Sequence, residues 1–163
     1  METVAFLQQQ PLFGGVDDRA MGCILPLLRE LSFVTGEVIV HEGEEGDSLF
    51  VICSGRVEIL KSSDSAGSET GRRIATLGVG DVFGEMELID MQCRSATVRA
   101  LEPVSALALS NGGLFQIYES DLPTFALIVL NLARELSRRL RRLDELAART
   151  AATGEPQTDD PRP

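Results

Sequence analysis

Residues 83–98 read FGEMELIDMQCRSATV, and the predicted fold and function both depend on this stretch. Gly84 allows the backbone to approach another group closely, and 85–88 can form one helical turn whose first N–H groups bind an anion. Arg94 can close the other side of such a site with a bidentate contact to a phosphate. Glu85 can accept hydrogen bonds from the hydroxyls of a sugar. The stretch therefore predicts a pocket for a phosphate attached to a ribose.

The apolar runs around this stretch are short and separated by glycines. They read SFVTGEVIVHEG, DSLFVICSG, RVEILKS, RRIATLGVG, DVFGE and RSATVRALEPVSALALS. This spacing predicts an all-β sandwich or barrel. Helical patterns flank it. Asp17 is suited to cap a helix that Pro26 ends or kinks, and Asp121 to cap a long helix over 123–149.

Composition and charge narrow the classes of function. The chain has 163 residues, 44% of them hydrophobic, and a formal net charge of −10, which argues against direct binding of DNA. Three scattered cysteines predict thiols in a reducing compartment, buried as small apolar groups. The start of the chain does not resemble a signal peptide, and the longest apolar run, 125–130, is too short to span a membrane. We therefore expect a soluble, cytoplasmic protein with no membrane partner.

Residues 83–98 resemble the phosphate-binding cassette of cyclic nucleotide-binding domains. LFGGVDDRAM resembles the leading helix of that family, and GEVIVHEGEEGDSLFVICSGRVEIL resembles its glycine-punctuated signature. The resemblance implies an α+β fold: an eight-stranded antiparallel β-roll, similar to a jelly roll, with short flanking helices and a long C-terminal helix. The expected parts are an N-terminal arm (1–11), the roll with its flanking helices (12–122), a lid and dimerisation helix (123–149) and a disordered tail (150–163).

The resemblance also assigns roles to residues. Arg94 would bind the exocyclic phosphate oxygens, and Glu85 would accept a hydrogen bond from the ribose 2′-OH. Glu87 stands where the family usually has a small residue, and its carboxylate would lower affinity unless it turned outward or paired with an arginine. The remaining predicted contacts are Met86, Glu87, Ser95 and Ala96 for the phosphate, Val98 and Ile74 for the base, and Phe83 and Gly84 beside them.

A heptad seam follows the long helix through Phe125, Val129, Leu132, Leu136, Arg139, Leu143 and Leu146. It predicts a homodimer through this helix. Arg139 is the one charged member, and two interpretations are open. It either snorkels at the edge of the seam, with Leu140 packing in its place, or stacks on the bound base and reads it. Relatives of the catabolite-activator type carry hydroxyl side chains to the base where this chain has Arg139 and Leu140, so base recognition should differ.

The predicted function is that of a sensor and not of an enzyme. The resemblance implies a receptor for a cyclic nucleotide, with cAMP favoured over cGMP, that signals by ligand-dependent docking of its C-terminal helix to an unidentified protein effector. No cofactor or metal is expected, because the sequence has one histidine, His41, and no cluster of metal ligands. Two alternatives remain: a dimerisation module with a vestigial pocket, and the sensor part of a longer transcription regulator.

Overall fold

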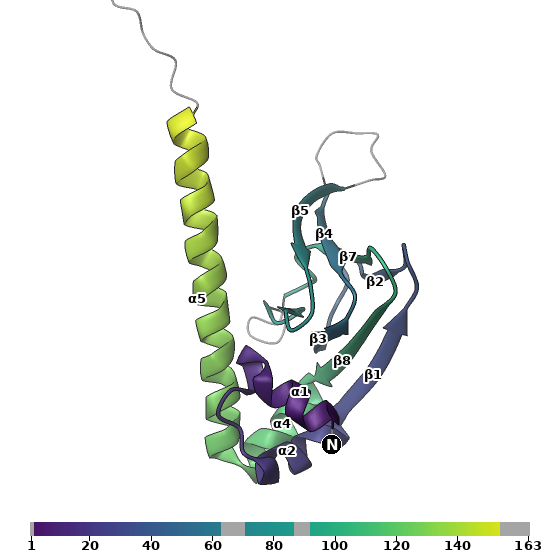
Figure 1. The fold of residues 1–163 in the computed structure, drawn as a ribbon, viewed down its shortest axis with the longest axis vertical. Helices are drawn as coiled ribbons and strands as arrows, with labels where there is room; N and C mark the ends of the chain where they lie inside the picture. Colours follow the sequence, from purple (N-terminus) through teal and green to yellow (C-terminus); the bar gives the residue numbers. More distant parts are fainter. Residues whose placement is uncertain (1, 63–70, 87–91, 154–163) are drawn as a thin grey trace, which may run out of the picture.

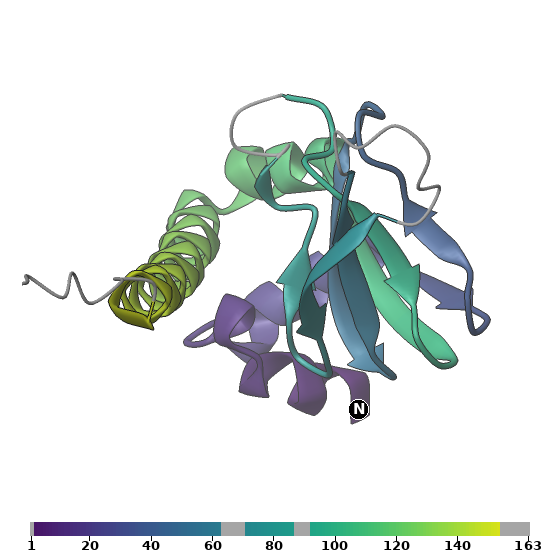
Figure 2. The ribbon, with the colours of Figure 1, turned by 90° about the horizontal axis from the view of Figure 1, so that it is seen from above.

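The computed structural model describes residues 2–62, 71–86 and 92–153. Eight antiparallel strands in this part form two four-stranded sheets, ordered β1-β8-β3-β6 and β2-β7-β4-β5 (Figures 1 and 2). The strands are β1 Leu28–Phe33, β2 Val38–Val40, β3 Ser48–Ser54, β4 Val57–Lys61, β5 Arg72–Leu77, β6 Val82–Phe83, β7 Thr97–Ala100 and β8 Val104–Ser110. The predicted fold class is confirmed.

The helices lie at the two ends of the chain. They are α1 Glu2–Gln9, α2 Asp18–Ile24, α4 Asn111–Ser120 and α5 Leu122–Thr153, with 3₁₀ turns η1 Pro11–Phe13 and η2 Leu25–Leu27. Asp17 caps α2 as predicted, since its Oδ1 accepts from the Ala20 N–H at 2.8 Å. The helix ends where Pro26 enters η2. None of the helices in the described ranges is long and apolar enough to cross a membrane.

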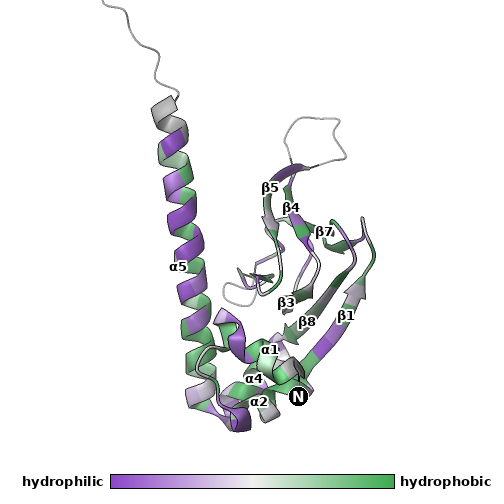
Figure 3. Cartoon of the chain, in the orientation of Figure 1, coloured by the Kyte–Doolittle hydropathy of each residue, from purple (hydrophilic) through white to green (hydrophobic). Residues whose placement is uncertain are grey.

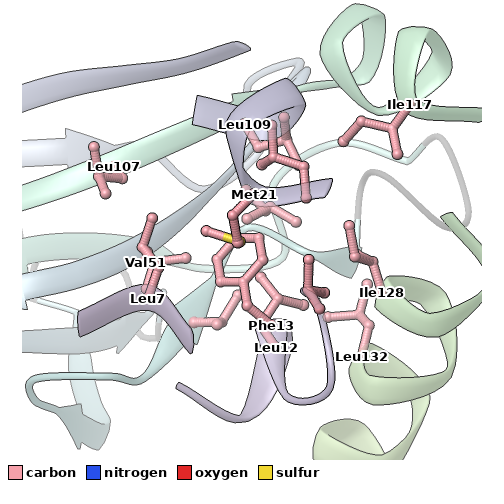
Figure 4. Packing of buried hydrophobic residues seen from close by; sticks show 14 of the residues in the cluster. Leu7, Leu12, Phe13, Met21, Val51, Leu107, Leu109, Ile117, Ile128 and Leu132 are labelled. Carbon is pink, nitrogen blue, oxygen red and sulfur yellow. The ribbon is translucent and has the colours of Figure 1, made fainter. Parts of the chain in front are cut away.

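Two apolar clusters hold the fold together. One fills the roll between the sheets and includes Ile52, Val57 and Ala100, which are at most 2% exposed. The other joins the helices to the outer face of sheet β1-β8-β3-β6, with Phe13 and Met21 fully buried in it (Figure 4). Alternation along the strands supplies both clusters, because successive side chains of a strand point to opposite faces.

The segment that we expected to be an N-terminal arm contains helix α1, and its Leu7 is fully buried in the second cluster. At the other end, α5 continues to Thr153, four residues past the expected boundary. The rest of the expected disordered tail lies outside the described residues. Burial of the cysteines was wrong: Cys23 and Cys93 are exposed, and Cys53 is half-buried.

The first half of α5 packs on the body of the molecule. Ile128 and Leu132 are 1% and 5% exposed and point toward Leu12 and Phe13 of η1 (Figure 4). Asn131 donates from Nδ2 to the carbonyl of Leu12 at 3.1 Å. Burying two such apolar side chains contributes about 1.5–3 kcal/mol each. Side chains 140–149 are all exposed. Helix α5 is thus anchored at its beginning and uncovered toward its end.

A second apolar row runs along α5 on a side that the body of the molecule leaves mostly uncovered. Figure 3 shows apolar and polar stretches alternating along this helix. The members of the row follow spacings of four and three residues, and all but the half-buried Leu136 are exposed: Leu122, Ala126, Val129, Ala133, Leu136, Leu140, Leu143 and Ala147. We call this row the outward seam. The outward seam differs in register from the seam predicted from the sequence. The members of the predicted seam do not share one side in the structure, because Leu132 and Arg139 face the body of the molecule while Leu143 is exposed.

Candidate functional site

Arg94 is a buried cation, 6% exposed, just before β7. Its guanidinium donates to the carbonyl oxygens of Ser48, at 2.9 Å, and Gly84, at 3.2 Å. It also lies over the Phe50 ring, 5.6 Å from the centroid, and that ring stacks on Phe83 at 4.8 Å. The charge is therefore held in one orientation by two carbonyls and an aromatic face.

Two glycines make room for this arginine. Gly84 has φ +76°, and a Cβ there would lie 2.4 Å from Nη1 of Arg94 and 2.8 Å from the Ser48 carbonyl oxygen. A Cβ on Gly46 would lie 2.2 Å from Nε of Arg94. The close approach that we predicted at Gly84 is thus an approach to the arginine. The sequence analysis missed Gly46, and the only signal was its place just before strand β3.

Glu85 lies next to Gly84 and is 5% exposed. Its Oε1 accepts from Nη1 of Arg139 at 2.9 Å, an ion pair that joins residues 54 positions apart. Arg139 also donates to the carbonyl of Val82, and its Nε lies 3.4 Å from Glu135. The Arg139 side chain is 24% exposed. Arg139 therefore does not extend away from the protein. It joins α5 to Glu85, the residue predicted to bind the ribose.

The other predicted phosphate contacts lie around Arg94. Ser95 is exposed, and its hydroxyl contacts Sδ of Met86 at 3.8 Å. Ala96 is half-buried just before β7. Glu87 and Leu88, the second half of the predicted helical turn, lie outside the described residues. The structure thus brings together Glu85, Met86, Arg94 and Ser95 across the gap between β6 and β7.

The two residues predicted to contact the base, Val98 and Ile74, differ in their exposure to solvent. Val98 on β7 is 4% exposed and packs in the cluster inside the roll. Ile74 on β5 is 58% exposed. Both strands flank β4, so the two residues belong to one sheet. His41, the one histidine of the sequence, is exposed.

Two hollows in the described surface lie apart from Arg94. The larger is a shallow, open depression along α5 beside Ala133, Arg134, Ser137, Arg138 and Arg141. The smaller, about 30 Å³, lies between η1, the turn before β6 and α5. Its lining includes Val82 and Glu135, which Arg139 contacts. The smaller hollow therefore borders the place where α5 meets the site.

The chain was compared with known proteins. It is 33% identical over 138 residues to the cyclic AMP receptor protein of Thermus thermophilus, covering 85% of this chain and 61% of that protein. A cyclic nucleotide-gated potassium channel of Rhizobium etli is 38% identical over 125 residues, covering 77% of this chain and 32% of the channel. The crystal structure of the Thermus thermophilus catabolite activator protein superposes with a TM-score of 0.72 at 32% identity, covering 86% of this chain and 63% of that one.

The chain thus spans about three fifths of the length of the Thermus thermophilus receptor. The sequence profile of the cyclic nucleotide-binding domain matches residues 30–121, which contain most of β1, all of β2 to β8, Glu85 and Arg94. The match covers more than half of the chain and includes both buried charges of the site. The chain therefore belongs to the cyclic nucleotide-binding domain family.

Proposed function

We propose that the chain is a cytoplasmic receptor for a cyclic nucleotide, with cAMP preferred over cGMP, and that it regulates a protein effector without catalysing a reaction. One observation carries the proposal. Glu85 and Arg94, on either side of the β6–β7 connection, are each at most 6% exposed and close to Gly84. A guanidinium has five N–H donors, so Arg94 can bind a phosphate oxygen while it keeps its bonds to the two carbonyls. The carboxylate of Glu85, next to Gly84 along the chain, can accept a hydrogen bond from a ribose 2′-OH.

The contact between Arg139 and Glu85 supports a role for α5 in the response. A sugar hydroxyl that donates to Glu85 has to share this carboxylate with Arg139 or displace it. Either event changes what holds α5 on the roll, so ligand binding shifts the position of the helix. We also propose that the Arg139 guanidinium, once it has left Glu85, stacks on the bound base.

The outward seam supports a homodimer through α5. Its members include Leu122, Val129, Leu140 and Leu143, which are 41–61% exposed. Apolar side chains repeated at this spacing are typical of two helices that pack side by side. A second copy of the chain would cover the row, and a shift of α5 would then be transmitted to the dimer and to a protein effector bound to it.

Calorimetric titration with cAMP and with cGMP tests the proposal, together with the melting temperature of the protein in the presence of each ligand. A ligand at 100 times its Kd stabilises the folded state by about 2.7 kcal/mol, so the parent should melt at a higher temperature with cAMP. Arg94→Ala should lose most of this shift. Arg56→Ala, which removes an exposed ion pair with Glu102, should keep it.

An absence of heat with both nucleotides for a folded parent would contradict the proposal. A dimer that persists in that case would favour the alternative of a dimerisation module with a vestigial pocket. Equal melting shifts for the parent and Arg94→Ala would show that the phosphate is bound elsewhere.

A further inference from the structure

The segment that follows Arg94 is held from one side by the turn at 42–44. The Arg94 N–H donates to the carbonyl of Glu44 at 2.7 Å, and the Gly43 N–H donates to the carbonyl of Arg94 at 2.8 Å. Three residues after Arg94, Oγ1 of Thr97 accepts from the Glu42 N–H at 3.0 Å. These contacts fix the two ends of the segment. A further contact, from outside this turn, reaches the peptide between Ser95 and Ala96.

Lys61, the last residue of β4, supplies that contact. Its Nζ donates to the carbonyl oxygen of Ser95 at 2.6 Å, across 34 positions of sequence. The carbonyl of Ser95 and the N–H of Ala96 belong to one planar trans peptide, in which they point in opposite directions. Because Lys61 holds the carbonyl, it also fixes the direction of the Ala96 N–H, which points away from the ammonium group. The positive charge polarises this peptide and makes its N–H a stronger donor.

The lysine is itself held in place. Oε1 of Glu42 lies 2.6 Å from Nζ of Lys61. The other oxygen of this carboxylate accepts from the backbone N–H of Ser62 at 2.8 Å and from its hydroxyl at 2.9 Å. The hydrogen bond from Lys61, followed by those from Ser62, lowers the pKa of Glu42 to about 2. The Glu42 carboxylate therefore stays ionised at neutral pH and holds the lysine side chain, which is 50% exposed.

We propose that Lys61 is a positioning residue for the nucleotide phosphate: through the Ser95 carbonyl it aims the Ala96 N–H at one exocyclic oxygen, and Glu42 holds it there. The proposal rests on the proposed function, since it presupposes a bound phosphate. It requires no contact between Lys61 and the ligand. It assigns the strength of one phosphate contact to a pair of residues outside the stretch 83–98, one on β4 and one in the turn after β2.

The test compares Lys61→Met with Lys61→Arg by calorimetry on the full chain, using cAMP and its two phosphorothioate diastereomers, each of which has sulfur in place of one exocyclic oxygen. Lys61→Met should weaken cAMP binding about tenfold, the scale of a charge-assisted hydrogen bond. It should also change the affinity ratio of the two diastereomers, because only one oxygen loses its donor. Lys61→Arg, which keeps a charged donor, should restore both values at least in part.

The matched control is Arg56→Met, which removes the exposed Arg56–Glu102 pair beside the other end of β4 and should leave both values unchanged. An affinity of Lys61→Met within twofold of the parent would overturn the proposal, and so would a uniform loss that leaves the diastereomer ratio unchanged. If Lys61→Met does not fold, Glu42→Gln decides on the same two values. A parent that binds no cyclic nucleotide would instead refute the proposed function.

Discussion

Arg94 shows what surroundings a single buried cation has in this fold. Its guanidinium is held by two backbone carbonyls, one ring and the space left by two glycines. The arginine and Glu85 were predicted from the stretch 83–98 alone. The surroundings of Arg94 were not, because Ser48 and Phe50 of β3, and Gly46 just before it, lie more than forty positions earlier. Only the pairing of β3 with β6 brings them to the arginine.

Gly46→Ala tests the importance of that space. A Cβ at Gly46 would lie 2.2 Å from Nε of Arg94, so the guanidinium has to move. We expect nucleotide affinity to fall about tenfold or more, because a contact to a phosphate depends on alignment. Gly22→Ala is the control, since a Cβ there meets nothing within 4 Å and alanine favours helix α2. Equal affinities for parent and Gly46→Ala in calorimetry would show that Arg94 tolerates displacement.

For Arg139, the sequence and the structure predict opposite effects of a leucine substitution on stability. A charge in an apolar seam would be expected to cost stability, and a leucine to restore it. The observed contacts predict the opposite, because Arg139→Leu leaves the buried Glu85 and the Val82 carbonyl without this donor. The sequence could not show this, since the partners lie 54 and 57 positions away and the helix direction decides which side meets them.

Arg139→Leu should lower the unfolding free energy of the ligand-free protein by about 1–3 kcal/mol, the cost of leaving a buried polar group without its partner. It should also weaken nucleotide binding by about 1 kcal/mol or more and reduce the preference between cAMP and cGMP. Denaturant melts and titrations with both nucleotides measure these effects. Arg138→Leu, which alters an exposed neighbour paired with Glu135, is the control. If Arg139→Leu binds both nucleotides within twofold of the parent, Arg139 does not select the base, and residues of the β-roll do.

At the scale of elements, α5 divides its apolar residues between two surfaces. Ile128 and Leu132 pack on the body of the molecule, and the outward seam lies on another side of the helix. The sequence predicted the helix and a heptad, but it mixed the two sides, since Leu132 and Leu143 fit the same spacing. Which register is outward follows from the position of the roll beside the helix, and no local pattern contains that information.

Two single substitutions distinguish the registers. Leu140 belongs only to the outward seam, and Leu146 belongs only to the seam predicted from the sequence. Leu140→Glu should convert a homodimer to monomers, because a carboxylate in a packed apolar row is unfavourable. Leu146→Glu should leave the dimer intact. Light scattering at tens of micromolar with ligand checks both, and a dimer lost only in Leu146→Glu would favour the first seam. A monomeric parent would contradict the dimer itself.

At the scale of the whole molecule, charge is distributed unevenly. Residues 1–130 have a net charge of −11, whereas 131–149 have a net charge of +3. Acidic groups in such a body affect stability when their pKa changes on folding. Glu42 is one, and its folded pKa of about 2 is below the ordinary value of 4.5. Its contribution is therefore present above pH 4.5 and is lost as the pH falls from 4.5 toward 2.

Glu42→Gln should for this reason reduce the loss of stability between pH 5 and pH 3. Solvent screens the exposed Lys61 side of the pair, so the effect should be modest. Urea midpoints at several pH values measure it, with Glu119→Gln, an exposed acid on α4, as the control. The same dependence on pH in parent and Glu42→Gln would mean that other carboxyl groups determine acid stability.

The pairing of β1 with β8 affects how the chain folds while it is being synthesised on the ribosome. Leu28 pairs with Leu109, so the edge strand β1 stays unpaired until a strand 81 residues later in the sequence has been synthesised. At roughly 5–20 residues per second, a ribosome takes about 4–16 s to reach it. An unpaired edge can join the wrong chain during that time. Arg29 and Glu30, both exposed on β1, place charges on this edge and oppose aggregation of the nascent protein.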